Sequence, residues 1–404
     1  MVNNIEQLLV QAQTAHDATD LSLLTQYLHQ MVLTNNAKQS ELVNLENLLE
    51  LALSILEMGD FQQRWDIAKV LIQLGTIAIP PLINILEDED TEDELRWFAV
   101  RILGELQHPD SISPLVELLQ NNPEEELKAI AATALGQMGN VAVPVLTKML
   151  QSDDTRLLAV RSLSYIRRPE TITPLLSVVE DAQAEVRTAA IEALSSFHDK
   201  RVPPILLNAL DDVAATVRRA AIQGLGFRPD LCAELDLVTR LQPKLYDFNI
   251  EVCCTAAVAL ARMGGDTAVK HLFTVLISPH TSITLQLEII RALIWVETLS
   301  GLEYLQQTLN HTTSATLWQE IVTVLGRVHK PELTTAATAI LLNMLSFQHP
   351  ATKITSIRSA IALSLGQLGS PQAAEFLHTL SDDTDELVKL HAIAALKKLE
   401  TSIA

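Results

Sequence analysis

The nine residues Val186-Arg-Thr-Ala-Ala-Ile-Glu-Ala-Leu194 recur, with variations, from near residue 64 to the end of the sequence. Close copies are Val217-Arg-Arg-Ala-Ala-Ile-Gln-Gly-Leu225 and Ile357-Arg-Ser-Ala-Ile-Ala-Leu-Ser-Leu365, and looser copies begin at Arg96, Lys128 and Arg156. A short motif that returns along the whole chain predicts a stack of similar units, each of which contacts its neighbours.

Every copy of the motif closes on a leucine, which we call the key leucine of its unit. The key leucines are Leu71, Leu103, Leu135, Leu163, Leu194, Leu225, Leu260, Leu293, Leu325, Leu365 and Leu396. Most intervals between them lie close to 31 residues, and the longest separates Leu325 from Leu365. A period of this length indicates stacked supersecondary units rather than two or three separate compact domains.

Each unit divides into two helical halves. The first half carries the motif and often closes with a glycine, as in Gln73-Leu-Gly75 and Gln367-Leu-Gly369, which suits a left-handed C-terminal cap. The second half commonly opens with proline, as in Pro80-Pro81 and Pro203-Pro204, because the first turn of a helix does not need that N–H. The sequence therefore predicts an all-α fold, an α-solenoid whose core comes from stacking.

A second repeated position lies seven residues before the key leucine, and we call it the ladder position. It holds Arg64, Arg96, Lys128, Arg156, Arg187, Arg218, Cys253, Gln286, Trp318, Arg358 and Lys389. Acidic residues precede it in the turns, as Asp153 and Asp154 precede Arg156. We expect the ladder side chains to pair with acids or carbonyl groups of these turns. The alternative is a role in binding a ligand.

The ends and the middle of the chain depart from the motif. Residues 1–60 have helical apolar spacing without the motif, which predicts an N-terminal helical cap. Residues 61–404 are expected to form the solenoid, about ten units with a capping helix near 387–400. The units between 227 and 355 are irregular and carry an insertion near His349-Pro350. We expect altered curvature and a partner contact in this irregular centre.

The composition excludes several classes of partner. The formal net charge of -20 disfavours nucleic acid and anionic membrane surfaces, which need a basic face. Three cysteines cannot build a disulfide framework, and neither a secretory signal nor a long apolar span is evident. We therefore expect a cytoplasmic protein. The densest acidic run, residues 87–94, is expected to be a solvated turn, with a docking patch for a basic partner as the alternative.

With its Val-Pro-Pro-Leu-Leu continuation, the motif resembles HEAT repeats, and the short units are similar to the phycobilisome-lyase-type HEAT-like repeat. The resemblance is good over 64–226 and 356–399 and weak over 227–355. It implies a right-handed superhelix whose second helices line a concave face. The family includes E/F-type phycobilin lyases, phycobilisome degradation factors and adaptors, so the resemblance implies no single chemistry.

The sequence predicts no catalytic residue, no metal site and no cofactor. The family includes a di-iron hydroxylase that uses His-Glu pairs, but none of the eleven histidines here precedes a glutamate. No Walker loop, dinucleotide fingerprint or Cys-x-x-Cys pair is present. Cys253 and Cys254 would point about 100° apart on a helix, which predicts small core residues. A bilin-handling or redox role for these thiols is the alternative.

We expect a binding surface on the second helices, where polar, mutually unlike residues form a row. The expected partner-binding residues are Asn84, Glu117, Lys148, Ser177, Asn208, Thr274 and Gln307, with Trp318 added as a possible aromatic anchor. Core packing is the leading interpretation of each tryptophan, and anchoring a partner is the alternative. The leading hypothesis is a non-catalytic scaffold or adaptor that holds a protein, with a phycobilisome-related client implied by the resemblance. The other is a phycobilin lyase or chaperone subunit, and only this one involves a bilin.

Overall fold

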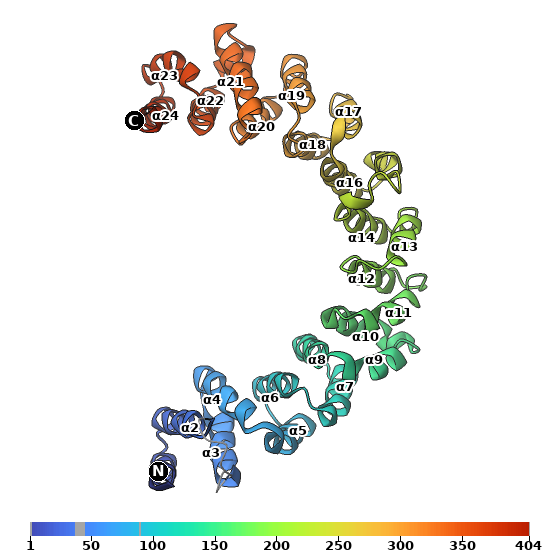
Figure 1. Ribbon diagram of the computed structural model, residues 1–404, viewed down its shortest axis with the longest axis vertical. Coiled ribbons are helices and arrows are strands. Elements are labelled where there is room, and N and C mark those ends of the chain that lie inside the picture. The colour runs from blue at the N-terminus through green and yellow to red at the C-terminus, as the bar shows by residue number, and fades with distance from the viewer. Residues whose placement is uncertain (1, 37–44, 89, 404) are drawn as a thin grey trace. The chain divides into compact units, whose positions relative to one another are not determined.

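The computed structural model describes residues 2–36, 45–88 and 90–403, with side chains for 7–33, 45–88 and 90–400. Over these residues the chain is helical and contains no strand (Figure 1). The prediction of an all-α solenoid is therefore confirmed. The chain divides into two compact units, Met1–His198 and Asp199–Ala404.

The N-terminal unit begins with three helices that lack the motif, α1 (Val2–Asp17), α2 (Leu21–Asn36) and α3 (Leu45–Met58). Both α2 and α3 pack on α4, the first helix that carries the motif. Its motif helices are α4 (Phe61–Leu74), α6 (Asp93–Leu106), α8 (Glu125–Gln137), α10 (Asp153–Ile166) and α12 (Ala184–Leu194). Between them lie the second helices α5 (Ile79–Glu87), α7 (Ile112–Asn121), α9 (Val143–Met149) and α11 (Ile172–Leu176).

The C-terminal unit repeats this alternation. Its motif helices are α14 (Ala215–Gly226), α16 (Ile250–Met263), α18 (Ile283–Trp295), α20 (Ala315–Leu325), α22 (Thr355–Leu368) and α24 (Glu386–Ile403). Its second helices are α13 (Val202–Ala209), α15 (Leu237–Leu241), α17 (Gly265–Leu276), α19 (Leu299–His311), α21 (Pro331–Ser346) and α23 (Ala374–Ser381). Within the expected irregular centre, the second helix is fragmented at α15, which continues as a 3-10 turn, Gln242–Tyr246.

The motif helices form the inner row of each unit, contrary to the expectation that the second helices line the concave face. Within each unit, successive motif helices contact one another more extensively than successive second helices do. Layers that approach more closely on one side bend the stack toward that side, and Figure 1 shows the motif helices there in both units. Their residues, rather than those of the second helices, therefore face the inside of each curve.

Small residues allow this close approach of the motif helices. A Cβ atom added at Gly104 would lie 2.7 Å from the Cβ atom of Ala134, and one at Gly366 would lie 2.7 Å from that of Ala395. Real Cβ atoms do not approach so closely. Each glycine directly follows a key leucine, and each alanine directly precedes the next one. The period of the motif therefore places glycine against alanine on successive helices.

The arginines at the ladder position bond to backbone carbonyl groups that precede their own helix, whereas Lys128 and Lys389 pair with Glu125 and Glu386 of their own helices. Arg218 donates to the carbonyl of Asp212 at 2.8 Å, and Arg358 donates to that of Thr352 at 3.1 Å. Both arginines also bind an acid of the following turn: Arg218 makes two 2.7 Å bonds to Asp247, and Arg358 binds Asp383. The expected pairing with turn acids and carbonyl groups is therefore confirmed for these arginines.

Three ladder positions without a basic residue also donate to a backbone carbonyl, either in the preceding turn or near the end of the preceding helix. The Sγ atom of Cys253 donates to the carbonyl of Asp247, the amide of Gln286 to that of Leu276, and the indole N–H of Trp318 to that of Leu309. The ladder position thus requires a hydrogen-bond donor, and positive charge is only one way to supply it. The stack passes through the irregular centre without losing this contact.

One described stretch, Phe61–Glu87, is long and apolar enough to cross a membrane by composition. It contains α4 and α5, which are separated at Gly75, where φ is 71°. Of its most apolar window, 44% is buried inside the protein. Helices that pack in a solenoid core account for such a composition.

The bidentate contact with Arg218 lowers the pKa of the Asp247 carboxyl, whose side chain is only 8% exposed. A lowered folded-state pKa stabilises the fold above the unfolded value, near 3.9 for aspartate, and this stabilisation is lost as pH falls through the folded-state pKa. We expect Asp247→Asn to lower the free energy of unfolding by about 1–3 kcal/mol at pH 7 and by less at pH 3. Guanidinium unfolding at both pH values, followed by circular dichroism, measures the difference.

The matched control is Asp154→Asn, which removes an exposed acid of another turn and should change stability little at either pH. A deficit of Asp247→Asn that is equally large at pH 7 and pH 3 would contradict the proposed role of the charged pair.

Candidate functional site

The structure places the expected partner-binding residues on the outer row, away from the inside of each curve. Asn84, Glu117 and Lys148 lie on α5, α7 and α9, and Ser177 directly follows α11. Asn208, Thr274 and Gln307 lie on α13, α17 and α19 of the C-terminal unit. All seven are exposed, but they do not form the concave row that was expected. Their role in partner binding stays a prediction.

Trp318 is buried, with 7% of its surface exposed, and is therefore not available as an anchor for a partner. It occupies the ladder position of α20, and its ring packs edge-on against His349. The opposite holds for Trp295, which is 63% exposed at the end of α18. The leading interpretation, core packing, is correct for Trp318 and wrong for Trp295.

The thiols of α16 are not poised for reaction. Cys253 is buried and donates its ladder bond, and burial raises its pKa. Burial, with a contribution from the nearby Glu288 carboxylate, raises the pKa of Cys254 to about 11. Since the thiolate is the reactive form, both groups are largely protonated at neutral pH. The hypothesis of small residues that serve packing agrees with this environment.

The acidic turn before α6 is partly used by the stack. Arg64 on α4 bonds to Glu92 and Glu94, and Arg96 donates to the backbone carbonyl of Asp88. The ion pairs of Arg64 neutralise part of the negative charge that a basic partner would bind. The hypothesis of a structural turn gains support from them.

A row of mostly aromatic or basic side chains lies at or near the C-terminal ends of the inner helices of the C-terminal unit, at the second residue after each key leucine. We call it the +2 row, and it consists of Phe227, Arg262, Trp295, Arg327, Gln367 and Lys398. The guanidinium of Arg262 lies 4.6 Å from the ring centroid of Phe227, a cation–π contact. Phe227 and Trp295 are both more than half exposed. The first four residues of the row therefore alternate aromatic faces with positive charge from one motif helix to the next.

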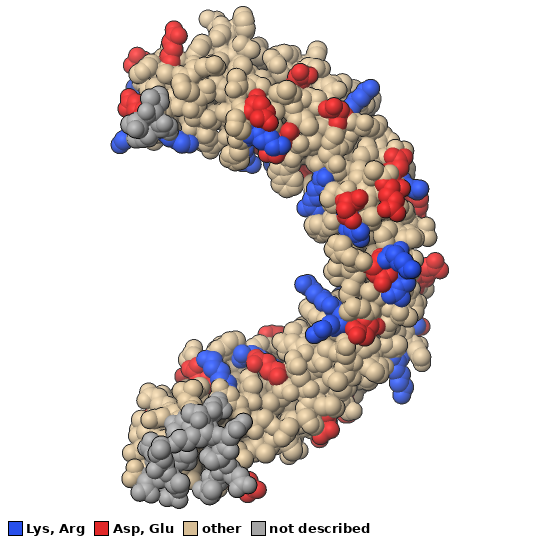
Figure 2. Space-filling view, in the orientation of Figure 1, with Lys and Arg blue, Asp and Glu red and all other residues tan. Residues whose placement is uncertain are grey.

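Two arginines of the +2 row lack a carboxylate partner among the described side chains. Neither Arg262 nor Arg327 forms an ion pair there, although the chain has 49 acidic against 29 basic residues. Figure 2 shows basic side chains at the inner edge of each unit, among a mostly uncharged surface. Exposed arginines left unpaired in so acidic a chain can bind an external anionic group.

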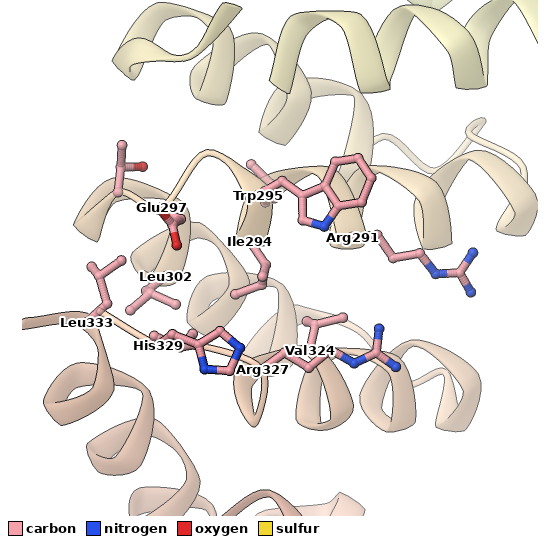
Figure 3. A pocket seen from close by; sticks show the side chains of 12 residues that line it. Arg291, Ile294, Trp295, Glu297, Leu302, Val324, Arg327, His329 and Leu333 are labelled. Atoms are coloured by element: carbon pink, nitrogen blue, oxygen red, sulfur yellow. The ribbon is translucent and has the colours of Figure 1, made fainter. Parts of the chain in front are cut away.

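A pocket of about 310 Å³ opens beside Trp295 where α18 and α20 end and α19 and α21 begin. In Figure 3, Trp295, Arg291 and Arg327 line one side of this pocket, and Leu302 and Leu333 lie toward the other. His329 lies beside Arg327. The pocket therefore combines an apolar wall with several donors.

Contacts between neighbouring repeats hold the walls of the pocket. Arg291 on α18 donates to Glu320 on α20 at 2.7 Å, and this hydrogen bond raises the pKa of the Arg291 guanidinium. Lys330 forms an ion pair with Glu297 at 2.9 Å across the connecting turns. Arg327 is not engaged in this way. Its guanidinium and the Trp295 indole are the groups that a ligand can reach without breaking an existing pair.

Sequence reasoning missed the +2 row, although a signal for it was present. Phe227, Arg262, Trp295 and Arg327 all lie two residues after a key leucine, so the alternation can be read directly from the repeat. It was overlooked because the second helices, rather than the motif helices, were expected to form the inner row.

Comparison with known protein families identifies the repeat. The model described as HEAT repeats matches residues 79–158, 151–226 and 314–397, and the model described as PBS lyase HEAT-like repeat matches residues 63–88. Together, the matches to the first model cover more than half of the chain.

One curated relative is the phycocyanobilin lyase subunit alpha of Synechococcus elongatus. It is 33% identical over 98 residues, which make up 23% of this chain and 36% of the relative. The chain thus matches about a third of the length of this relative.

Among solved structures, a chain from a structure in which Kap95p binds RanGDP is similar over 99% of this chain and 60% of its own length. The TM-score is 0.56 and the sequence identity is 15%, so the likeness concerns the fold alone. A weaker likeness, with a TM-score of 0.38 and 20% identity, links 80% of the chain with 98% of an engineered protein.

The two tryptophans on neighbouring motif helices should respond differently to the same substitution. Trp318→Phe removes the buried N–H that bonds to Leu309, so we expect a loss of about 1 kcal/mol in the free energy of unfolding. Because His349 also contacts that carbonyl, the loss should not be much larger. Trp295→Phe at the exposed position should change stability by less than about 0.5 kcal/mol. Equal losses in chemical denaturation of the two variants would contradict these assignments.

Proposed function

Because the chain belongs to the HEAT-repeat family, we propose that it is a non-catalytic scaffold that holds a protein partner along the inner helices of its C-terminal unit. The observation that carries the proposal is the exposed Trp295 beside the unpaired Arg327. Tryptophan and arginine are the residue types that contribute most to binding energy at protein interfaces. Exposing both in one place has no use in the stack itself.

The chemistry of the +2 row indicates what the partner presents. Guanidinium groups bind carboxylates with two parallel hydrogen bonds, and the rings of Phe227 and Trp295 offer apolar faces. We infer a partner segment that carries both acidic and apolar side chains. In this proposal the scaffold works in the cytoplasm, in keeping with its three free cysteines, and its net charge disfavours nucleic acid.

Spacing supports recognition rather than bond-making. Successive +2 residues lie on successive helices, and packed helices are separated by about 8–10 Å. Groups arranged in this way contact an extended surface but cannot converge on one reacting atom. The row therefore suits a long partner segment, with the pocket at Trp295 as its principal anchor point.

Variants of the +2 row should lose the partner without losing the fold. We expect Trp295→Ala and Arg327→Glu each to weaken capture of the same proteins from native cell extract by at least about tenfold. Quantitative mass spectrometry of proteins retained by each variant measures the effect, and thermal unfolding should show intact stacks, because both side chains are exposed.

The control variants are Asn84→Lys and Gln307→Lys, which place positive charge on the outer row. If the outer row carries no partner, these variants capture the same proteins as the unaltered chain. Loss of capture in the outer-row variants, with retention in Trp295→Ala, would support the expected second-helix surface instead and contradict the inner-row proposal.

We also propose a second candidate function, favoured by the partial identity with a phycocyanobilin lyase subunit. In this alternative the chain is a subunit that presents a bilin to a phycobiliprotein or removes it. The pocket at Trp295 offers about 310 Å³, at the small end of the range for ligand sites, and the thiols of α16 are protonated. For the pocket at Trp295, both observations favour the scaffold.

Absorbance spectroscopy separates the two functions. A bilin titrated into the purified chain should keep the spectrum of the free pigment if the chain is only a scaffold. A saturable shift that is lost in Arg327→Glu would establish the alternative. A shift that persists in this variant would mean that the pigment binds elsewhere.

A further inference from the structure

The last motif helix, α24, is apolar on two opposite faces. Val388, Ala392, Ala395 and Leu399 are buried against α22 and α23. On the other side of the helix, Leu387, Leu390 and Ile393 are 52%, 61% and 54% exposed. A helix with apolar side chains on two opposite faces normally lies between two neighbours.

The repeat shows that these outer side chains occupy positions that are normally covered. Ile393 lies three residues before its key leucine, and the same position in each of the ten preceding motif helices is apolar and at most 6% exposed. These equivalents are Ala68, Val100, Ala132, Val160, Ile191, Ile222, Ala257, Ile290, Val322 and Ala362. Within each stack the next motif helix packs on this side. Ile393 therefore belongs to a surface built for contact.

A further repeat of the same kind would not pack well on this surface. The position directly after the key leucine is uncharged in every other motif helix and is glycine in five of them, as at Gly326 and Gly366. In α24 this position is Lys397, which is exposed. A lysine there opposes the close approach that glycine permits, so a partner of different geometry is required.

We propose that α24 docks on the α24 helix of a second copy of this chain, in antiparallel orientation. Glu386, Leu390, Ile393 and Lys397 follow one another at helical spacing and form one exposed line. An antiparallel pair centred between residues 391 and 392 brings Leu390 of each copy opposite Ile393 of the other. The same alignment brings Glu386 opposite Lys397 at both ends.

Charge complementarity selects this arrangement. In a parallel pair, Glu386 would face Glu386 of the second copy and Lys397 would face Lys397. Like charges would then repel each other at both ends. In the antiparallel pair, every charge meets its opposite. The existing partner of Glu386, Lys389 at 2.8 Å, lies in the same first turn, where such exposed pairs contribute little. Glu386 can therefore turn to Lys397 of the second copy at small cost.

The size of the contact sets the expected affinity. Two helices that pack against each other through one exposed line of side chains bury less than the roughly 1,200 Å² of total surface found in stable specific complexes. We therefore expect a reversible dimer in the micromolar range rather than a permanent one. This inference does not rest on the proposed function, since the exposed line of α24 and the pocket at Trp295 share no residue.

Sedimentation velocity of the full chain, from about 1 to several hundred micromolar, tests the dimer. We expect concentration-dependent association that Ile393→Glu abolishes. Glu386→Lys and Lys397→Glu should each weaken association by about tenfold, since each puts like charges face to face. The double variant Glu386→Lys/Lys397→Glu restores opposite charges and should regain most of the affinity. Only the antiparallel register predicts this recovery.

The control variant is Val213→Glu, which alters a side chain that is 93% exposed on another surface and should leave association unchanged. A chain that stays monomeric over the whole range would overturn the proposal. Association that survives Ile393→Glu, or a double variant no stronger than its two parents, would overturn it as well. Circular dichroism of each variant verifies that the exposed substitutions leave the fold intact.

Discussion

In most repeats one hydrogen bond, from the ladder side chain to a carbonyl group at the end of the preceding helix or in the turn that follows it, ties the motif helix to its predecessor. An unpaired carbonyl buried at a helix end costs about 1–3 kcal/mol, so each such bond removes a local penalty. Most units use arginine, whose several N–H groups can also reach an acid of the following turn, as Arg218 reaches Asp247. Cys253, Gln286 and Trp318 keep the carbonyl bond and give up the acid. The irregular centre is thus irregular in charge and regular in hydrogen bonding.

Because stack and binding surface use different positions of the same helix, they can be separated residue by residue. The key leucines and ladder side chains are already engaged in contacts within and between repeats. The +2 row makes few such contacts, which is why Trp295 and Arg327 stay exposed. In the N-terminal unit the same positions are Gln73, Glu105, Gln137, Tyr165 and Ser196, a set without arginine. The two units therefore present different chemistry from one architecture.

The stack could be predicted from the sequence because its signals are periodic: leucine, ladder residue, glycine and proline recur at fixed offsets. The inner face could not be predicted in the same way. Which row of helices lies inside the curve depends on which row packs more closely. That spacing follows from contacts between successive repeats, such as Gly104 against Ala134. The sequence of a single repeat does not show these contacts. The two tryptophans show the remaining difficulty. Trp318 and Trp295 differ in burial because one lies seven residues before a key leucine and the other two residues after.

The separation of the motif helices has a consequence for any chain that lies along the +2 row. Packed helices repeat at about 8–10 Å, and a partner in the extended polyproline II conformation advances by about 3.1 Å per residue, with three residues per turn, so that every third side chain lies on the same side. Three residues of an extended partner therefore span one step of the row. A segment bound in this way would meet Phe227, Arg262, Trp295 and Arg327 with every third side chain, alternately apolar and acidic. The +2 row would then contact every third side chain of the partner, and the two side chains in between would remain exposed to solvent.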